Sequence, residues 1–159
     1  MCSEYMKMTG DLFDMAVKAA ENAYAPFSHF NVGAALLASS GRAYTGVNVE
    51  NSSFGAAICA ERTAFVKAIS EGERDFTAIA IAARNSEGSI VESLPCGICR
   101  QFMYEFSPEI FVITGTDREK LNVRKLSELL PLGFSLEPQQ RQQFAEMTAA
   151  GLCRSPAFE

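Results

Sequence analysis

Histidine is nearly absent from this sequence of 159 residues, in which His29 is the single example. A metal site built from three histidines is therefore excluded, and so is the paired-histidine motif His-Glu-x-x-His. Because His29 stands in an expected loop, outside the motifs described below, we expect it to have no catalytic role. Any chemistry at a metal must use other ligands.

The sequence also has no long apolar run and no basic cluster. A membrane-spanning helix needs roughly 18 consecutive apolar residues, and no run approaches that length. Proteins that bind nucleic acids usually carry a stripe of lysine and arginine, whereas this chain has a formal net charge of −5. We therefore expect a small-molecule substrate, with no nucleic acid and no membrane as partners.

The first eight residues, Met1–Met8, lack the charged region and the apolar core of a signal peptide. We therefore expect a cytoplasmic protein, in which the cysteines are thiols or metal ligands and not disulfides. Hydrophobic residues make up 48% of the chain, which is normal for one globular domain with a sizeable core.

Three of the five cysteines fall in two short motifs, Cys59-Ala60-Glu61 and Pro95-Cys96-Gly97-Ile98-Cys99. Thiolates are soft ligands that suit zinc. A structural zinc site would need a fourth cysteine or histidine, and neither motif offers one, so a catalytic site with water in the fourth position is favoured. Glu61 follows the first cysteine closely enough to serve that water. The remaining Cys2 and Cys153 lie near the termini and have no evident role.

Both motifs lie where we expect helices to begin, and a helix N-terminus carries roughly half a positive charge. That field favours the thiolate, which is the form that binds metals. Three thiolates and Zn²⁺ would sum to one negative charge, which disfavours ionisation of a bound water. Arg62, directly after Glu61, is the candidate to offset that charge; the alternative is a surface arginine in an ordinary ion pair.

The two motifs resemble the signature of the zinc-dependent nucleoside deaminases. The resemblance covers the chain from about Tyr24 to Phe134 and points to the small, homotetrameric cytidine deaminases. It is carried by Tyr24–Phe30 (YAPFSHF), Val32–Ala35 (VGAA), Gly46–Asn51 (GVNVEN), Cys59–Thr63 (CAERT), Pro95–Gln101 (PCGICRQ) and Leu129–Pro131 (LLP). Together these stretches form a far more specific fingerprint than a lone Cys-x-x-Cys.

The resemblance implies an enzyme of pyrimidine salvage that hydrolytically deaminates cytidine and 2′-deoxycytidine. It implies a zinc ion bound by Cys59, Cys96 and Cys99. Glu61 would carry protons from the attacking water to N3 of cytosine and to the departing amine. Arg62 would donate hydrogen bonds to the ligand sulfurs, a contact that tunes the metal.

Asn48 and Glu50 are spaced by two at the end of an expected strand, so their side chains point to the same face. An amide beside a carboxylate suits the hydroxyls of a ribose, and the resemblance implies the same role. It further implies that Phe27 packs on the pyrimidine and that Ala60 offers backbone groups to the base. The alternatives are a polar strand edge for the pair and core packing for Phe27.

The order of the elements predicts a layered α/β fold. We expect a three-layer α/β/α sandwich with a mixed sheet of about five strands, as the resemblance implies. Helices are expected over 11–23, 59–70, 96–106 and 123–130, and strands over 32–39, 42–49, 76–83 and 110–114. Residues 1–10 are expected to be loose.

The catalytic domain is expected to span residues 1–136, and residues 137–159 are an extension of unknown role with a short helix from Pro138 to about Ala150. The resemblance implies a homotetramer in which Phe134 reaches the pyrimidine site of a neighbouring subunit; the alternative is that it caps its own sheet. Phe54, in a polar loop before Cys59, is a second stranded aromatic of the kind that fills a partner's pocket.

Two other functions stay open at this point. A deaminase of a cytosine-containing antibiotic such as blasticidin S would share both zinc motifs, although the Asn48 and Glu50 pair argues against it. A non-catalytic zinc-binding protein would share the thiols, although it would not need Glu61. A polynucleotide-editing deaminase is disfavoured by the acidic charge balance.

Overall fold

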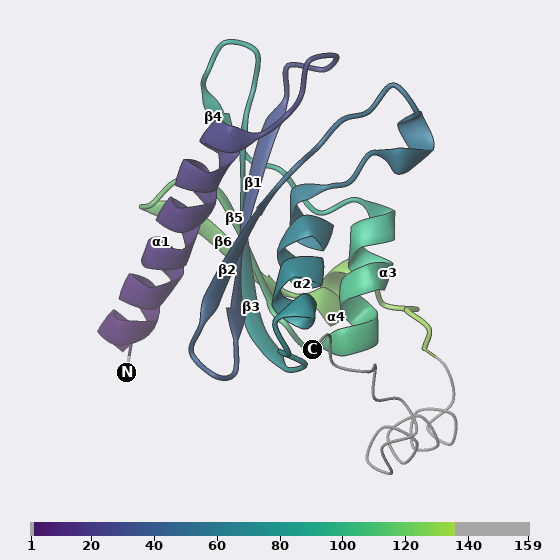
Figure 1. Cartoon of the computed structure of the whole chain (residues 1–159). Helices are drawn as coiled ribbons and strands as arrows, with labels where there is room; N and C mark the ends of the chain where they lie inside the picture. Colours follow the sequence, from purple (N-terminus) through teal and green to yellow (C-terminus); the bar gives the residue numbers. More distant parts are fainter. Residues whose placement is uncertain (1, 136–159) are drawn as a thin grey trace, which may run out of the picture.

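A computed structural model describes residues 2–135 of the chain, and the side chains from residue 7 onward (Figure 1). The chain folds into three layers, in which one mixed sheet lies between α1 on one face and α2 and α3 on the other. The layered α/β architecture predicted from the sequence is therefore confirmed. None of the helices described is long and apolar enough to cross a membrane.

The sheet has six strands in the order β2-β1-β3-β5-β6, with the short β4 paired to β3 beside this path. The strands are β1 (Asn31–Ala38), β2 (Ala43–Val47), β3 (Phe76–Arg84), β4 (Ile90–Val91), β5 (Phe111–Asp117) and β6 (Lys120–Lys125). Only the β3–β5 pair is parallel among the described strands. The central β3 contains the strand predicted over 76–83, and its residues from Ala78 to Ala83 are all buried, as in a strand covered on both faces.

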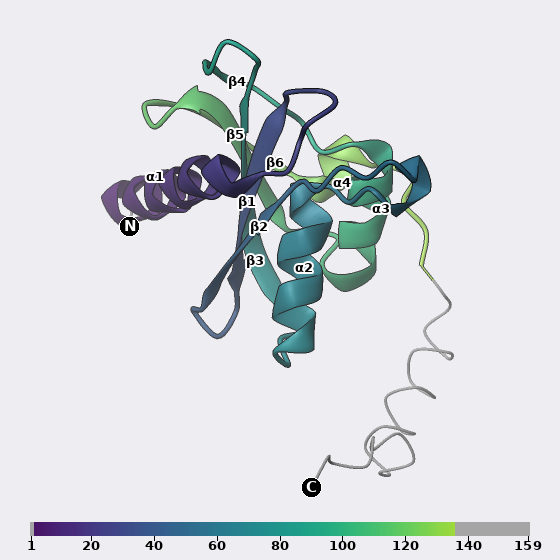
Figure 2. The same ribbon diagram turned by 45° about the horizontal axis from the view of Figure 1, so that its top comes forward.

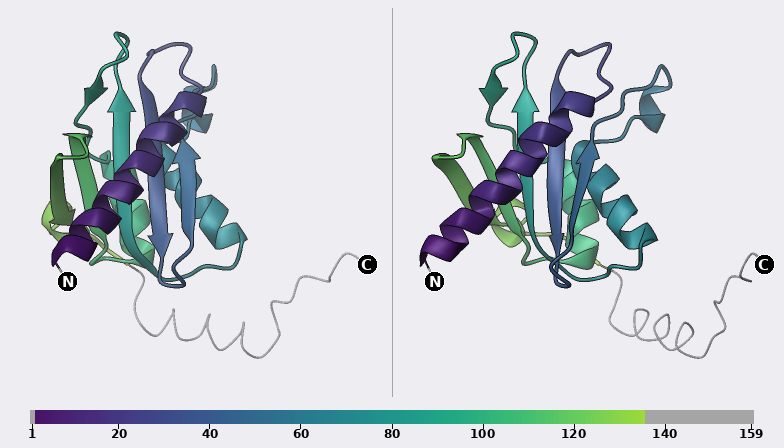
Figure 3. Two further views of the ribbon diagram at one scale, coloured as in Figure 1. Left: turned by 90° about the vertical axis from the view of Figure 1, so that its left-hand side faces the viewer. Right: turned by 60° about the vertical axis from the view of Figure 1, so that its left-hand side comes forward.

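The helices are α1 (Cys2–Ala19), α2 (Ala60–Ser70), α3 (Gly97–Phe106) and the single turn α4 (Leu126–Leu129). Short 3₁₀ turns occupy Ala20–Asn22 and Phe54–Ala56. Figure 3 shows α1 lying diagonally across the strands on its own side of the sheet. On the opposite side, Phe65 of α2 packs against Phe102 and Phe106 of α3, and the rings hold the two helices together.

The prediction that residues 1–10 are loose is wrong, because α1 already begins at Cys2. Thr9 and Gly10 are weak helix formers, but both are buried where α1 packs against the rest of the chain. Arg118, between β5 and β6, lies against Gly10 and forms ion pairs with Asp11 and Asp14. Tertiary contacts therefore extend the helix beyond its periodic stretch.

The helix predicted over 123–130 is also wrong in its first part. Val123–Lys125 belongs to β6, where Val123 pairs with Ile113 of β5, and only Leu126–Leu129 forms a helical turn. Pairing with a neighbouring strand decides this conformation, and local propensity does not reveal it. The helix expected from Pro138 lies outside the described residues.

Two glycines allow the helices to lie directly on the sheet. A methyl group at Gly33 of β1 would meet the backbone oxygen of Ala16 in α1 at 2.1 Å. A methyl group at Gly46 of β2 would meet the backbone of Ala64 and Ala60 in α2 at 2.3 and 2.4 Å. The second contact matters for the site, because it sets the start of α2 beside the end of β2.

Candidate active site and metal centre

The three motif cysteines meet at one point between α2 and α3. Cys59 is the residue before α2, Cys96 is the residue before α3, and Cys99 lies in the first turn of α3. Their sulfur atoms all lie within 4.8 Å of one another, and those of Cys59 and Cys96 are 3.8 Å apart. Tetrahedral zinc with Zn–S bonds of about 2.3 Å would separate its sulfurs by about 3.8 Å. The geometry therefore fits a zinc ion.

The start of each helix faces this sulfur cluster, as the sequence predicts. Helices α2 and α3 run side by side on the same face of the sheet (Figure 2). Neither Cys59 nor Cys96 caps its helix with a side-chain hydrogen bond, so both sulfurs are available for other contacts. The positive ends of two helix dipoles therefore add to the field that favours thiolate at this point.

The sulfurs also change one another's acidity. A hydrogen bond from Cys99, together with Arg62 and Cys96, lowers the pKa of Cys59 to about 5. The same hydrogen bond and burial raise the pKa of Cys99. Ionisation of one thiol therefore disfavours ionisation of its neighbour when the sulfurs share no cation. A divalent cation removes that conflict, because it holds all three as thiolates.

Arg62 lies against the sulfur cluster, where its positive charge is needed. Burial lowers the pKa of this guanidinium, but the adjacent sulfurs of Cys59 and Cys99 raise it by more than burial lowers it. The net effect is a raised pKa. Its Nη2 donates to the backbone oxygen of Ala57 at 3.3 Å. Its buried Nε makes no regular hydrogen bond with a described residue. Arg62 therefore acts on the sulfurs through hydrogen bonding first and through its charge second.

Glu61 is the buried carboxyl group of this site, with only 4% of its surface exposed. Burial raises its pKa, and the negative charge of Cys59 raises it further. A carboxyl group whose pKa is moved toward neutrality can both accept and return a proton at physiological pH. The position and the environment of Glu61 therefore suit a general acid–base residue.

A cavity of about 280 Å³ opens beside Glu61. Its lining joins the sulfur cluster to the end of β2 and to the segment that precedes α3. The residues are Ser28, Phe30, Val32, Asn48, Glu50, Cys59, Ala60, Glu61, Ser93, Leu94 and Cys96. The structure thus brings the predicted Asn48, Glu50 and Ala60 together with Glu61 and two of the thiols.

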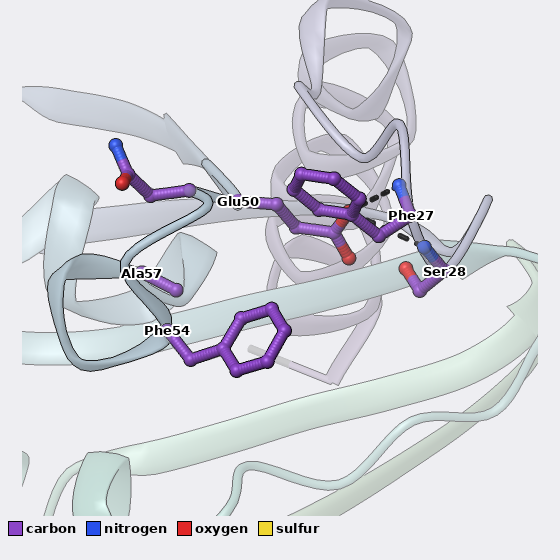
Figure 4. A pocket seen from close by; sticks show the side chains of 6 residues that line it. Phe27, Ser28, Glu50, Phe54 and Ala57 are labelled. Atoms are coloured by element: carbon purple, nitrogen blue, oxygen red, sulfur yellow. Dashed lines mark hydrogen bonds between the residues drawn. The ribbon is translucent and has the colours of Figure 1, made fainter.

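Asn48 and Glu50 also brace the loop that precedes β1. The Asn48 amide accepts a hydrogen bond from the Val32 N–H at 2.8 Å and donates one to the Phe30 carbonyl at 2.9 Å. Glu50 Oε2 accepts from the Phe27 N–H at 2.8 Å and from the Ser28 N–H at 3.3 Å (Figure 4). Hydrogen bonds from the Ser28 hydroxyl and the Phe27 N–H lower the pKa of Glu50, so it is a carboxylate at neutral pH.

Phe27 lies outside the cavity that holds Glu61. It lines a neighbouring hollow of about 360 Å³ with Ser28, Glu50, Asn51, Phe54 and Ala57, and its ring meets that of Phe54 edge to face (Figure 4). Phe30 is the aromatic residue that lines the cavity beside the thiols. Sequence reasoning missed Phe30, although the same aromatic-rich motif contains both residues.

Phe134 follows α4, and its ring does not line the cavity of its own chain. Its backbone is fixed by Gln101 of α3, whose side-chain amide donates to the Phe134 carbonyl at 2.7 Å and accepts from its N–H at 3.3 Å. The residue is nevertheless 72% exposed. A held backbone with an exposed ring suits a contact outside this chain.

Comparisons with known proteins agree with this site. The family model for the cytidine and deoxycytidylate deaminase zinc-binding region matches residues 6–114. A probable cytidine deaminase of Dictyostelium discoideum is 47% identical over 124 residues, covering 78% of this chain and 82% of that protein. The cytidine deaminase of Halalkalibacterium halodurans is 45% identical over 127 residues, covering 79% of this chain and 93% of the relative.

The fold has solved counterparts. The crystal structure of cytidine deaminase from Burkholderia pseudomallei superposes with a TM-score of 0.71 at 40% sequence identity, covering 78% of this chain and 97% of that one. Fold and thiol cluster together define a zinc-binding hydrolytic deaminase. The chain belongs to the cytidine and deoxycytidylate deaminase family.

Proposed function

We propose that the protein hydrolyses the C4–amino bond of cytidine and 2′-deoxycytidine, giving uridine or 2′-deoxyuridine and ammonia. The observation that carries this proposal is the placement of buried Glu61 beside three converging thiols, in a cavity whose other wall holds Asn48 and Glu50. Cys59, Cys96 and Cys99 would hold the zinc ion. Bound zinc supplies a water of lowered pKa as the nucleophile at neutral pH.

The remaining chemistry falls to the residues of the chain. Glu61 accepts a proton from the attacking water, delivers one to N3 of the ring and assists protonation of the amine, which leaves as ammonia. Arg62 and the two helix N-termini offset the negative charge of three thiolates. Because Glu61 is almost fully buried, bulk solvent is kept away from these proton transfers.

Recognition of the nucleoside falls to the opposite wall. The Asn48 amide and the Glu50 carboxylate suit the hydroxyls of a ribose, and Phe30 offers an aromatic face beside the thiols. Ala60, at the first turn of α2, offers backbone groups to the base. Phe27, in the adjoining hollow, stays a candidate for contact with the nucleoside.

An assay with four substrates tests this function. Purified protein loaded with zinc is expected to release ammonia from cytidine and 2′-deoxycytidine, and much less from cytosine, which has no sugar for Asn48 and Glu50. Blasticidin S is expected to be a poor substrate; the blasticidin-S deaminase of Bacillus cereus is only 28% identical to the chain over 129 residues. Preference for blasticidin S, or no turnover of any substrate, would contradict the proposal.

The homotetramer and a cytoplasmic role in pyrimidine salvage also belong to this proposal. Support for assembly comes from large apolar side chains left in solvent, with Phe54 82% exposed and Leu132 94% exposed. Exposed apolar groups of this size usually mark a contact surface. By resemblance, Phe134 would complete the pyrimidine site of a neighbouring subunit.

Sedimentation of the active enzyme is expected to give four times the chain mass of 17.3 kDa. Phe134→Ala should lower kcat/KM by about tenfold or more, because an aromatic contact that would be buried in the tetramer is lost, while the thermal midpoint of the isolated chain changes little. Phe134→Leu, which keeps an apolar side chain, should lose less. A fully active monomer would reject the assembly and leave the proposed chemistry intact.

A further inference from the structure

The segment 92–95 joins β4 to Cys96, the residue before α3, and forms one wall of the cavity. Ser93 and Leu94 line that cavity together with Cys96, while Glu92 points its side chain away toward β5 and β6. A wall of this kind must hold its shape when a ligand enters. The contacts that fix the segment are therefore of interest.

Few hydrogen bonds hold the segment. Within the described part of the chain, no backbone hydrogen bond ties Ser93 or Leu94 to another element. At the far end of the segment, Arg100 Nε donates to the Pro95 carbonyl at 2.7 Å, and Arg100 Nη1 donates to the Leu129 carbonyl at 3.0 Å. At the near end, Val91 pairs with Ala83 of β3, and beyond that pair the segment is attached through the side chain of Glu92.

The Glu92 carboxylate is bound by a pair of facing strand residues. Its Oε1 accepts a hydrogen bond from the Thr114 hydroxyl and another from the Asn122 amide, each at 2.8 Å. Thr114 and Asn122 face each other across β5 and β6, and Thr114 is only 1% exposed. Arg124 of β6 adds its charge at 3.8 Å. These contacts, that of Thr114 first, lower the pKa of Glu92, so it is a carboxylate at neutral pH.

We propose that Glu92 is a positioning residue for the reaction: by anchoring the near end of segment 92–95 to β5 and β6, it holds Ser93 and Leu94 as a fixed wall of the substrate cavity. The proposal rests on the proposed function only in taking this cavity as the substrate site. Glu92 does not line the cavity itself. It therefore acts on substrate affinity through the segment, whereas Cys96 and Cys99 are held independently by α3 and Arg100.

Kinetics of two variants test this role. Glu92→Ala removes both hydrogen bonds and is expected to raise KM for cytidine about tenfold, with a much smaller change in kcat and no loss of zinc. Glu92→Gln keeps an acceptor oxygen for Thr114 and Asn122, so its KM should stay within about threefold of the original value. Asn122→Ala should raise KM in the same direction as Glu92→Ala, and the double variant should be no worse than Glu92→Ala.

Glu109→Ala is the matched control. Glu109 is also a glutamate whose carboxylate binds a residue of β6, accepting from Lys125 Nζ at 2.9 Å. It does not line the cavity, so KM should not change. An unchanged KM in Glu92→Ala would overturn the proposal. So would equal losses in Glu92→Ala and Glu92→Gln, or a KM rise in Glu109→Ala as large as that in Glu92→Ala.

NMR relaxation of the backbone gives a readout that does not depend on the enzyme's activity. The order parameters of the Ser93 and Leu94 amides should be lower in Glu92→Ala than in the wild type or in Glu109→Ala, because the side-chain anchor of the segment is gone. If the wild type fails to turn over cytidine but this relaxation pattern appears, the proposed function fails while the anchoring role stands. Identical order parameters in Glu92→Ala and the wild type would overturn the anchoring role.

Discussion

Replacing Glu61 with glutamine is expected to abolish turnover of cytidine while the protein keeps its fold and its zinc. The amide has nearly the same size as the carboxyl group, so the buried site can accommodate it. It cannot carry a proton between water, N3 and the leaving amine. General acid–base catalysis is typically worth about 10²–10⁴ in rate, and kcat should fall at least that far. Single-turnover kinetics on the zinc-loaded variant would measure the loss.

Stability provides the control for this variant. Burial raises the pKa of Glu61, so the native state binds this proton more tightly than the unfolded state does. The ionised form therefore destabilises the native state, and that cost grows as pH rises above the unfolded pKa of about 4.3. Glu61→Gln removes the cost, so at pH 7 and in the absence of zinc its thermal midpoint should equal or exceed that of the wild type. Near-normal turnover would overturn the role of Glu61.

Replacing Cys99 with serine should abolish zinc binding and activity together and should also lower stability. Cys99 is fully buried in the first turn of α3, beside Cys59, and the serine hydroxyl is a far weaker ligand for zinc than a thiolate. Zinc that binds only the native state stabilises it by mass action. The zinc content measured by metal analysis should fall from one ion per chain toward none. The thermal midpoint should no longer change when a chelator is added.

The wild type treated with a chelator is the reference for this variant. It should lose activity and stability in parallel and recover both when zinc is returned, whereas Cys99→Ser should not recover. Cys153→Ser is the matched cysteine control, since no role is expected for that residue, which lies outside the described range. Zinc that persists after Cys59, Cys96 and Cys99 are all changed to serine would place the metal elsewhere.

The sequence predicts most of the layered fold because its central features are local. The apolar run of β3 and the Ser39-Ser40-Gly41 turn between β1 and β2 need no distant partner to be recognised. The start of α1 and the strand β6 were missed for the opposite reason. Thr9 and Gly10 at the start of α1 are buried, with Arg118 against Gly10, and β5 holds Val123 in a strand, although these partners lie elsewhere in the sequence.

The same distinction applies to the site. The thiols and Glu61 are signalled by short spacings at two helix starts, and the structure brings them together. Phe30 and Glu92 carry no comparable signal. Which aromatic residue of the loop faces the cavity depends on backbone conformation, including the left-handed His29 with φ of 54°. The role of Glu92 depends on Thr114 and Asn122, more than twenty residues further along the chain.

The close contact at Gly46 has a consequence for how this enzyme can change over generations. Because the backbone of α2 lies directly on β2 there, no layer of side chains separates the strand that leads to Asn48 and Glu50 from the helix whose first turn holds Glu61. Core substitutions that alter side-chain volume elsewhere can accumulate without moving the wall with Asn48 and Glu50 away from the wall with Glu61. The spacing between these two walls is thereby insulated from sequence drift in the core, whereas a side chain at position 46 would force β2 and α2 apart.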